Sequence, residues 1–482
     1  MDTFYWFDFE TYGTLPEKDR PCQFAGIRTD HQFNLIGEPL NIFCQPANDV
    51  LPHPEACLIT GITPQHALNH GVCESDFFAK IHQELAQPNT CSVGYNNIRF
   101  DDEVIRYGFY RNFFDIYGRE FQNANSRWDI LDMLRMTYAL RPEGIQWPLN
   151  DEGNPSFRLE LLTKANNILH DAAHDALSDV YATIAMAKLV KQKQPKLYDY
   201  LFKMRNKRQV AALLHLQQHP LFVHSSGMLG SEHHFTGVMM PLLQNPANNN
   251  SIICLNLLHD FDALESLTVE EIKYRLFTKQ ADLTEGVQRL SIKEIHINKC
   301  PAVAPLGVLD NQSLQRLAID LSLCQSRAKK IFTFMDELNS KLKQVFAERN
   351  YKPILNPDYA LYSGFFSPSD SKQVQKVRQL DWETLSQTKF NFKDNRLDDL
   401  LFRFRARNAP WSLKPEEKLQ WDSYCYQQLI NEASDASINY PQLKDKIALL
   451  LNQELSDHDR QILISVEEYA TKLIADLSQN QR

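Results

Sequence analysis

The alternation of apolar and polar residues is most distinctive close to the N-terminus. Residues 4–10 read Phe-Tyr-Trp-Phe-Asp-Phe-Glu, an aromatic run that ends in two carboxylates two positions apart. Read as a strand, this run is apolar on both faces, which is typical of a buried central strand. Asp8 and Glu10 then share one face at the C-terminal end of the strand, the end near which ligands bind in open α/β sheets.

The pattern predicts an α/β layer architecture for about the first 190 residues. Further strands are expected at 22–29, 40–44 and 91–95. Thr63-Pro64 predicts a capped helix start, and Ser75 is expected to cap a helix whose apolar residues recur at helical spacing. Later helices are expected at about 128–140, at 158–168, and from just after His174 to about Lys191.

The pattern changes after residue 194. A basic helix is expected over about 197–215, followed by short β-rich runs at 221–225, 235–243, 251–258 and 292–298 and a helical pattern over 314–348. Residues 358–482 are helical by periodicity, with no predicted strand. We therefore predict three domains, 1–194, 195–351 and 352–482, in keeping with about 150 residues per domain.

Composition narrows the class of protein. The chain of 482 residues has a net charge of −9 and nine scattered cysteines without CxxC spacing. No apolar run is long enough to span a bilayer, and the cysteines indicate neither a disulfide framework nor a zinc site. We expect a soluble cytoplasmic protein that does not bind membranes. The negative charge argues against nucleic acid, but clusters such as residues 203–208 counter that argument unless they are only solvated helix faces.

Five residues of the first 190 suggest a common chemistry: Asp8, Glu10, Asp101, His174 and Asp179. Oxygen ligands suit Mg²⁺ or Mn²⁺, and a pair of such ions held by carboxylates supports phosphodiester hydrolysis. A histidine can accept the proton of the attacking water. Each residue also has a plain structural explanation: an acidic turn, acids in the first turn of a helix, or a helix-capping histidine.

The spacing of these residues resembles a known family. Asp8-x-Glu10, Asp101 within residues 94–103, and His174-x4-Asp179 match the three motifs of the DEDD exonucleases in their histidine subclass. Longer sequence segments resemble the bacterial exodeoxyribonuclease I family over essentially the whole chain. They are residues 9–14 (FETYGT), 58–64 (LITGITP), 139–145 (ALRPEGI), 296–301 (HINKCP) and 405–408 (RARN).

The resemblance implies a processive 3′→5′ exonuclease that degrades single-stranded DNA to 5′-mononucleotides in DNA repair and recombination. It implies an RNase H-like α/β exonuclease domain, an SH3-like β-containing domain and an all-α C-terminal domain. It places metal ligands for two Mg²⁺ ions, which Mn²⁺ can replace, on Asp8, Glu10, Asp101 and Asp179, and the general base on His174. Substrate contacts are implied for Glu10 and His174, and for Arg158, Arg106, Tyr117, Arg135, Lys207, Lys293 and Asn298.

The resemblance also implies a protein partner. The family docks the acidic C-terminal tail of single-stranded DNA-binding protein in a basic groove, and Arg141 and Tyr200 match positions of that groove. Pro305 and Asp310 depart from the family pattern, since a polar and a basic residue are usual there. We expect the protein to act as a monomer.

Two other functions are compatible with parts of the chain. An exoribonuclease or proofreading exonuclease would share the catalytic domain, but such relatives are typically little more than that domain. A non-catalytic scaffold that binds single-stranded DNA would have lost an acid, whereas all four acids and the histidine are present.

Overall fold

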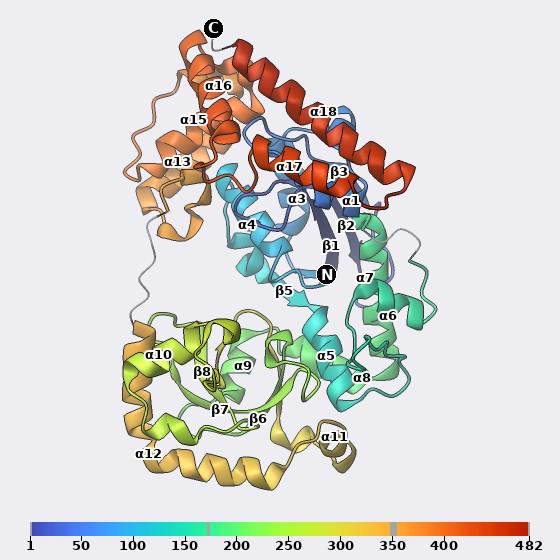
Figure 1. Cartoon of the computed structure of the whole chain (residues 1–482), viewed down its shortest axis with the longest axis vertical. Coiled ribbons are helices and arrows are strands. Elements are labelled where there is room, and N and C mark those ends of the chain that lie inside the picture. Colours follow the sequence, from blue (N-terminus) through green and yellow to red (C-terminus); the bar gives the residue numbers. More distant parts are fainter. Residues whose placement is uncertain (1, 171–173, 348–353, 481–482) are drawn as a thin grey trace. The chain divides into compact units, whose positions relative to one another are not determined.

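The computed structural model describes residues 2–170, 174–347 and 354–480 (Figure 1). The chain forms two compact units, each described here on its own. Unit 1 comprises residues 1–126, 170–183 and 353–482, and unit 2 comprises residues 127–169 and 184–352. Within the described ranges, no helix combines the length and the apolar character that crossing a membrane requires.

The sheet of unit 1 is built around the aromatic strand. Its strand order is β3-β2-β1-β4-β5. The strands are β1 (Thr3–Thr11), β2 (Pro21–Thr29), β3 (Leu40–Phe43), β4 (Thr90–Gly94) and β5 (Ser126–Asp129), the last of which runs into unit 2. β1 pairs antiparallel with β2 and parallel with β4, so its predicted central position is confirmed.

Both faces of β1 are buried, because each packs against a different set of side chains. Tyr5, Phe7 and Phe9 join a core with apolar residues of α3 (Glu74–Leu85) and α4 (Asp101–Arg111). On the opposite face, the Trp6 indole donates a hydrogen bond to the hydroxyl of Thr29 (2.9 Å). These contacts leave only the end of the strand, where the acids stand, for a polar site.

Two other helices of the N-terminal part were predicted, α2 (Pro64–His70) and α7 (Ala176–Lys193), which begins in unit 1. The short helix α1 (Pro54–Thr60) was not predicted. Thr63 caps α2 as predicted, by accepting a hydrogen bond from the His66 amide. The prediction for Ser75 is wrong: Cys73 is the N-cap of α3, and Ser75 lies buried in its first turn.

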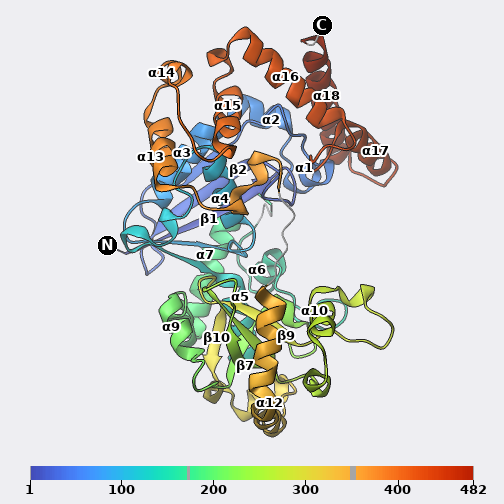
Figure 2. The same ribbon diagram turned by 90° about the vertical axis from the view of Figure 1, so that its left-hand side faces the viewer.

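In its described residues, the C-terminal part of unit 1 forms helices joined by loops, with no strand, as predicted. Its helices are α13 (Pro368–Gln379), α14 (Trp382–Gln387), α15 (Arg396–Asn408), α16 (Pro415–Ile430), α17 (Tyr440–Leu451) and α18 (Asp457–Gln479). α18 packs on α1 and α2, and Figure 2 shows these helices from a second side. Tyr12 and Leu51 share one core with Trp421 and Leu463, so the two ends of the chain fold together.

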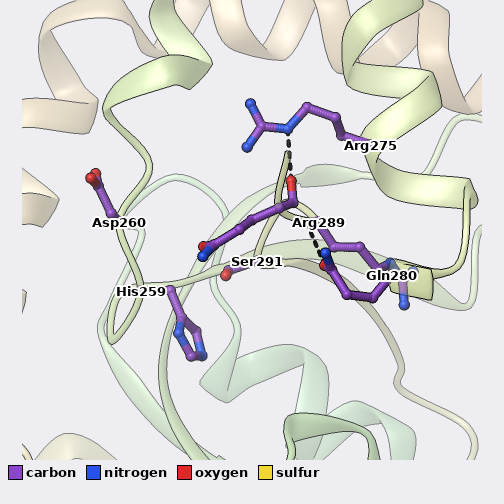
Figure 3. A pocket seen from close by; sticks show the side chains of 7 residues that line it. His259, Asp260, Arg275, Gln280, Arg289 and Ser291 are labelled. Atoms are coloured by element: carbon purple, nitrogen blue, oxygen red, sulfur yellow. Dashed lines mark hydrogen bonds between the residues drawn. The ribbon is translucent and has the colours of Figure 1, made fainter. Parts of the chain in front are cut away.

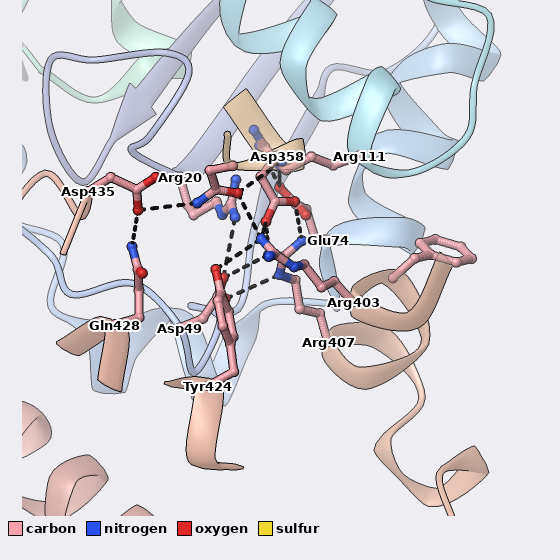
Figure 4. A network of polar contacts seen from close by, with 12 residues as sticks. Arg20, Asp49, Glu74, Arg111, Asp358, Arg403, Arg407, Tyr424, Gln428 and Asp435 are labelled. Atoms are coloured by element: carbon pink, nitrogen blue, oxygen red, sulfur yellow. Dashed lines mark hydrogen bonds and ion pairs between the residues drawn. The ribbon is translucent and has the colours of Figure 1, made fainter. Parts of the chain in front are cut away.

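A buried polar network joins the same two segments of unit 1 (Figure 4). Asp358 accepts hydrogen bonds from Arg403 (2.6 Å) and Arg407 (2.6 and 2.8 Å). Arg407 also pairs with Asp49 (2.7 Å), which lies 3.7 Å from Arg20. Because these charges are almost fully buried, each depends on its partners for solvation that water cannot supply.

Unit 2 combines a second sheet with helices. The sheet has the order β10-β6-β7-β8-β9, and its paired strands are all antiparallel. The strands are β6 (Phe222–Ser225), β7 (Thr236–Gln244), β8 (Ser251–Asn256), β9 (Ile292–His296) and β10 (Ala302–Pro305). The helices are α5 (Ile130–Leu140), α6 (Leu159–Ala165), α8 (Pro195–Lys203), α9 (Lys207–Leu213), α10 (Val269–Phe277), α11 (Asn311–Arg316) and α12 (Leu321–Ala347).

Several predicted elements of unit 2 need correction. The helix expected from residue 128 begins at Ile130, because Asp129 ends β5 and its side chain caps α5. The expected basic helix is two helices, since Asn206 interrupts it and caps α9. β10 and α10 were not predicted. A signal for α10 was nevertheless present, because Thr268 and Glu271 form a reciprocal capping box.

Candidate active site

The site begins with the two acids at the end of β1. Asp8 is half-buried and Glu10 is 9 % exposed. In the antiparallel pair with β2, Glu10 stands opposite Gln23, and the register shifts directly after Glu10. The regular pairing of the sheet therefore fixes both carboxylates and stops just beyond them.

Asp101 reaches the same edge from the neighbouring strand. Because β4 runs parallel to β1, both strands end at one edge, and the chain then turns through Asn96 (φ +62°) into α4. Asp101 is the first residue of α4, and its carboxylate accepts a hydrogen bond from the Phe9 amide (3.1 Å). Asp102 instead forms a fully buried ion pair with Arg119 (2.6 Å), so its carboxylate stabilises the fold and does not face the site.

The remaining two residues, His174 and Asp179, lie just before and in the first turn of α7. The neighbouring Asp175 anchors this segment. Asp175 accepts hydrogen bonds from the Ser178 amide (3.1 Å) and from the side chain of Gln23 (2.8 Å). Gln23 thus ties the start of α7 to the strand beside β1. The predicted loop position of His174 is confirmed: it precedes α7, is exposed, and has a left-handed backbone (φ +68°) that non-glycine residues rarely adopt.

These attachments bring the predicted residues together. Glu10, His174 and Asp179 each offer one ligand atom, and those atoms all lie within 4.8 Å of one another. Asp8 lies close enough to Asp101, Glu10 and Asp179 for each carboxylate to raise its pKa. The structure therefore assembles all five residues at one sheet edge.

The electrostatics of this edge favour a bound cation. Burial first, and then the neighbouring carboxylates, raise the pKa of Asp8 well above its usual range and that of Glu10 to about 9. Burial also raises the pKa of Asp179, although its hydrogen bond to His170 opposes the rise. Closely spaced acids repel one another, and a divalent cation relieves that repulsion. Carboxylate oxygens are the ligands that a hard divalent ion prefers, and the His174 imidazole lies beside them.

His170 belongs to this site although the sequence analysis did not single it out. Its Nε2 lies 2.5 Å from an Asp179 carboxylate oxygen, and its side chain is only 4 % exposed. A buried imidazole in this position holds the Asp179 carboxylate in one orientation, as outer partners of metal ligands commonly do. The only sequence signal was a second histidine four residues before His174.

Besides Glu10 and His174, two implied substrate contacts lie in unit 1, Arg106 and Tyr117. The side chain of Arg106 is 9 % exposed and pairs with Glu103 (2.6 Å) and Glu120 (2.8 Å), so its charge is already compensated. It lies 5.5 Å over the ring of Tyr117. The Tyr117 ring in turn lies 6.2 Å from that of Phe365, a residue that the sequence analysis did not single out and that is 89 % exposed.

The implied contacts in unit 2 lie on several elements. Arg135 pairs with Asp132 (2.5 Å) on α5, and Arg158, just before α6, pairs with Glu160 (2.5 Å). Lys207 is the exposed first residue of α9. Lys293 on β9 donates to the Ser226 hydroxyl (2.8 Å), and the main-chain carbonyl of Asn298 accepts from Arg127 (3.2 Å).

The two partner residues also lie in unit 2. Arg141 lies 3.3 Å from Asp310, the acid that departs from the family pattern, and it donates to the carbonyl of Val308 (3.2 Å). The Tyr200 hydroxyl donates to the carbonyl of Val303 (3.2 Å). Roles in binding for all these residues stay predictions.

Comparison with known proteins places the chain in a family. Three family models match in succession: Exonuclease (residues 5–187), Exonuclease I SH3-like domain (205–348) and Exonuclease I C-terminal domain (355–473). The chain is 44% identical to exodeoxyribonuclease I of Haemophilus influenzae, over 98% of this chain and 99% of that protein.

Solved structures agree with this assignment. E. coli exonuclease I in complex with a dA16 oligonucleotide is 44% identical, with a TM-score of 0.94 over 98% of this chain and 100% of that one. A structure described as SSB/exonuclease I in complex with an inhibitor is 42% identical, with a TM-score of 0.90 over the same shares of the two chains. The predicted order of an exonuclease domain, an SH3-like domain and a helical C-terminal domain is confirmed. This chain therefore belongs to the exodeoxyribonuclease I family.

Proposed function

We propose that this protein is a 3′→5′ exonuclease that degrades single-stranded DNA to 5′-mononucleotides. The observation that carries the proposal is the convergence of Glu10, His174 and Asp179, with ligand atoms within 4.8 Å of one another, at the sheet edge that also holds Asp8 and Asp101. Family relatives bear the corresponding name, and one was solved with a DNA oligonucleotide.

In this proposal, Asp8, Glu10, Asp101 and Asp179 hold two divalent cations, Mg²⁺ by preference. When bound, such ions activate a water and stabilise the leaving oxygen of a phosphodiester. The protein's part is to keep the carboxylates in place. The pairing of β1 with β2 holds Glu10, the Phe9 amide holds Asp101, and His170 holds Asp179.

His174 is the proposed general base. Its imidazole accepts a proton from the water that attacks the last phosphodiester of the strand. The new bond forms between the water oxygen and phosphorus, and the bond from phosphorus to the 3′ oxygen of the preceding nucleotide breaks. The 3′ oxygen takes up a proton, and the terminal nucleotide leaves with its 5′ phosphate. The exposed position of His174, ahead of α7, leaves its imidazole accessible to water.

The rest of the strand would contact aromatic and cationic side chains. Tyr117 and the highly exposed Phe365 offer neighbouring ring faces on unit 1, and such faces stack bases regardless of sequence. Arg135, Arg158, Lys207, Lys293 and Asn298 are the proposed contacts on unit 2, where the cations would neutralise phosphates. Arg106 is a weaker candidate, because Glu103 and Glu120 already compensate its charge.

We further propose that single-stranded DNA-binding protein docks near Arg141 and Tyr200 through its acidic C-terminal tail. A related exonuclease I was solved together with that partner. The tail must displace Asp310 from Arg141, since the two side chains lie 3.3 Å apart. Binding should therefore be weaker than it would be at an unpaired arginine.

The test is a digestion assay with single-stranded DNA labelled at either end. Mg²⁺ should support stepwise loss from the 3′ end, and excess chelator should stop it. Glu10→Gln should abolish hydrolysis, whereas Glu38→Gln, the same change at an exposed position of unit 1, should have no effect. Cleavage in excess chelator, or an active Glu10→Gln enzyme, would contradict the proposal. Equal digestion of a matching RNA strand would favour the exoribonuclease alternative.

A further inference from the structure

Unit 2 contains a polar cavity of about 440 Å³ that involves none of the residues assigned above (Figure 3). One wall is formed by His259 and Asp260, which follow β8. Another is Arg275 on α10. The segment from Gln280 to Ser291, which leads into β9, supplies the rest, including Arg289.

Two guanidinium groups in this cavity are held in place by main-chain carbonyls. Arg275 donates from Nε to the carbonyl of Gln288 (2.8 Å), and Arg289 donates from Nη2 to that of Leu276 (2.6 Å). Each arginine thus secures the segment that carries the other. Among the residues that the structure describes, neither guanidinium forms an ion pair within 4.0 Å, and Glu271 is the acid near enough to Arg275 for its pKa to be lowered by that charge. Because the side chains are already ordered, a ligand would bind them at a reduced entropic cost.

The other lining groups are mostly hydrogen-bond donors. Gln280 stiffens the segment, since it accepts from the Arg289 amide (3.1 Å) and donates to the carbonyl of Val287 (3.0 Å). The Gln288 amide and the Ser291 hydroxyl add further donors, and Asp260 is the single acid of the lining. The carboxylate of Glu271, four residues before Arg275, accepts a hydrogen bond from the Thr268 amide as part of the helix cap.

This chemistry selects an anion with several acceptor oxygens. A planar guanidinium presents paired donors that match a phosphate or carboxylate. No aliphatic side chain and no phenylalanine, tyrosine or tryptophan lines the cavity, so it offers little to a nucleobase. The cavity therefore fits a phosphate group rather than a whole nucleotide.

We propose that the cavity of Arg275 and Arg289 binds a backbone phosphate of the single-stranded DNA substrate. This inference rests on the proposed function and adds a substrate contact in the SH3-like domain. A strand long enough to reach both the cavity and the active site gains affinity that a short strand lacks. Each phosphate neutralised also releases counterions, so this part of the affinity falls as salt rises.

Two variants test the proposal. Gln288→Glu adds a carboxylate of the same size to the lining and leaves intact the Gln288 carbonyl that Arg275 uses. Arg275→Gln combined with Arg289→Gln removes both cations. The matched controls are Gln325→Glu, and Lys188→Gln combined with Lys343→Gln, at exposed positions of α7 and α12 in the same unit.

Affinity for a short and a long oligothymidylate is measured by fluorescence anisotropy in chelator over a range of salt concentrations. Gln288→Glu should weaken binding of the long strand about tenfold. The double arginine variant should also flatten its salt slope by about 0.7 units, the change expected for one phosphate of a single strand. Binding of the short strand, and binding by both controls, should match wild type. If the double arginine variant has a lower melting temperature than wild type, its loss of binding could reflect unfolding. The affinity of Gln288→Glu is then the only result used to test the proposal.

Three results would overturn the proposal. The first is that Gln288→Glu binds the long strand with wild-type affinity. The second is that the variants lose equal affinity for short and long strands, and the third is that the cavity binds the mononucleotide product and not the strand. In the last case, thymidine monophosphate would raise the melting temperature of wild type but not of the arginine variant, with long-strand affinity unchanged. Failure of the proposed function is separate. It would appear as no Mg²⁺-dependent digestion of the short strand by the wild-type enzyme, whatever the cavity binds.

Discussion

Removing the charge of Asp358 should loosen the contact between the C-terminal helices and the exonuclease sheet. Asp358 is 1 % exposed and accepts hydrogen bonds from Arg403 and Arg407 of α15. Arg407 continues the contact to Asp49, which follows β3. Asp358→Asn keeps the shape of the side chain and removes only its charge, so it isolates the electrostatic contribution.

The magnitude follows from the charges that remain. In the wild-type protein, Asp49 and Asp358 face three arginines, Arg20, Arg403 and Arg407. The variant leaves Arg407 paired with Asp49. Among the described residues, it leaves Arg403 with only the neutral partners Asn356 and Tyr424. Breaking a buried ion pair on one side typically costs about 3–5 kcal/mol. We expect a loss of that size, which is a large part of the stability of an ordinary domain.

The assay is native-state hydrogen exchange, read by mass spectrometry in peptides of α15 and α16. A loss of about 3–5 kcal/mol corresponds to exchange faster by about 10²- to 10⁴-fold in these helices. Peptides of β7 and β8 in unit 2 serve as an internal reference. Glu55→Gln is the matched control, because Glu55 and Lys446 join α1 to α17 in an ion pair with side chains 43% and 41% exposed. The loss of stability in Glu55→Gln should stay below about 1 kcal/mol.

Exchange in α15 that stays within about fivefold of wild type would refute the argument. Equal increases in exchange rate for Asp358→Asn and Glu55→Gln would refute it as well, because burial would then make no difference to how much an ion pair contributes to stability.

Four further outcomes are expected. His174→Ala should lower kcat by about 10²- to 10⁴-fold and remove the acidic limb of the pH–rate profile, as measured by steady-state digestion. Phe365→Ala should weaken binding of single-stranded DNA by about 1–3 kcal/mol in an anisotropy titration, whereas the exposed Trp411, changed to Ala, should have no effect. Arg141→Ala should spare digestion of naked DNA and slow that of strands coated with single-stranded DNA-binding protein. Burial raises the pKa of Glu74, but Arg111 outweighs it, so that the folded-state pKa is about 2. This depressed pKa stabilises the fold above the unfolded value of about 4.3, and the stabilisation should vanish in acid melts as pH falls toward 2.

The sequence by itself determined the parts of this protein that depend on local order. The aromatic run of residues 4–10 specified a central strand, because both faces of a strand can be read directly from alternation. Asp8 and Glu10 fell at its end by the same counting. The resemblance to the exonuclease motifs selected Asp101, His174 and Asp179, since motif spacing is a property of the chain itself.

Only the tertiary structure decided what each side chain contacts. Hydrophobic pattern and charge alone do not separate Asp101 from Asp102, yet Asp101 accepts a hydrogen bond from the Phe9 amide of β1 and Asp102 pairs with Arg119. Gln23 meets Asp175 across 152 positions, and Phe365 reaches Tyr117 across a still longer stretch of chain. Such partners are chosen by packing of the whole unit. Periodicity reports which face of an element is apolar, but not which distant residue will lie against it.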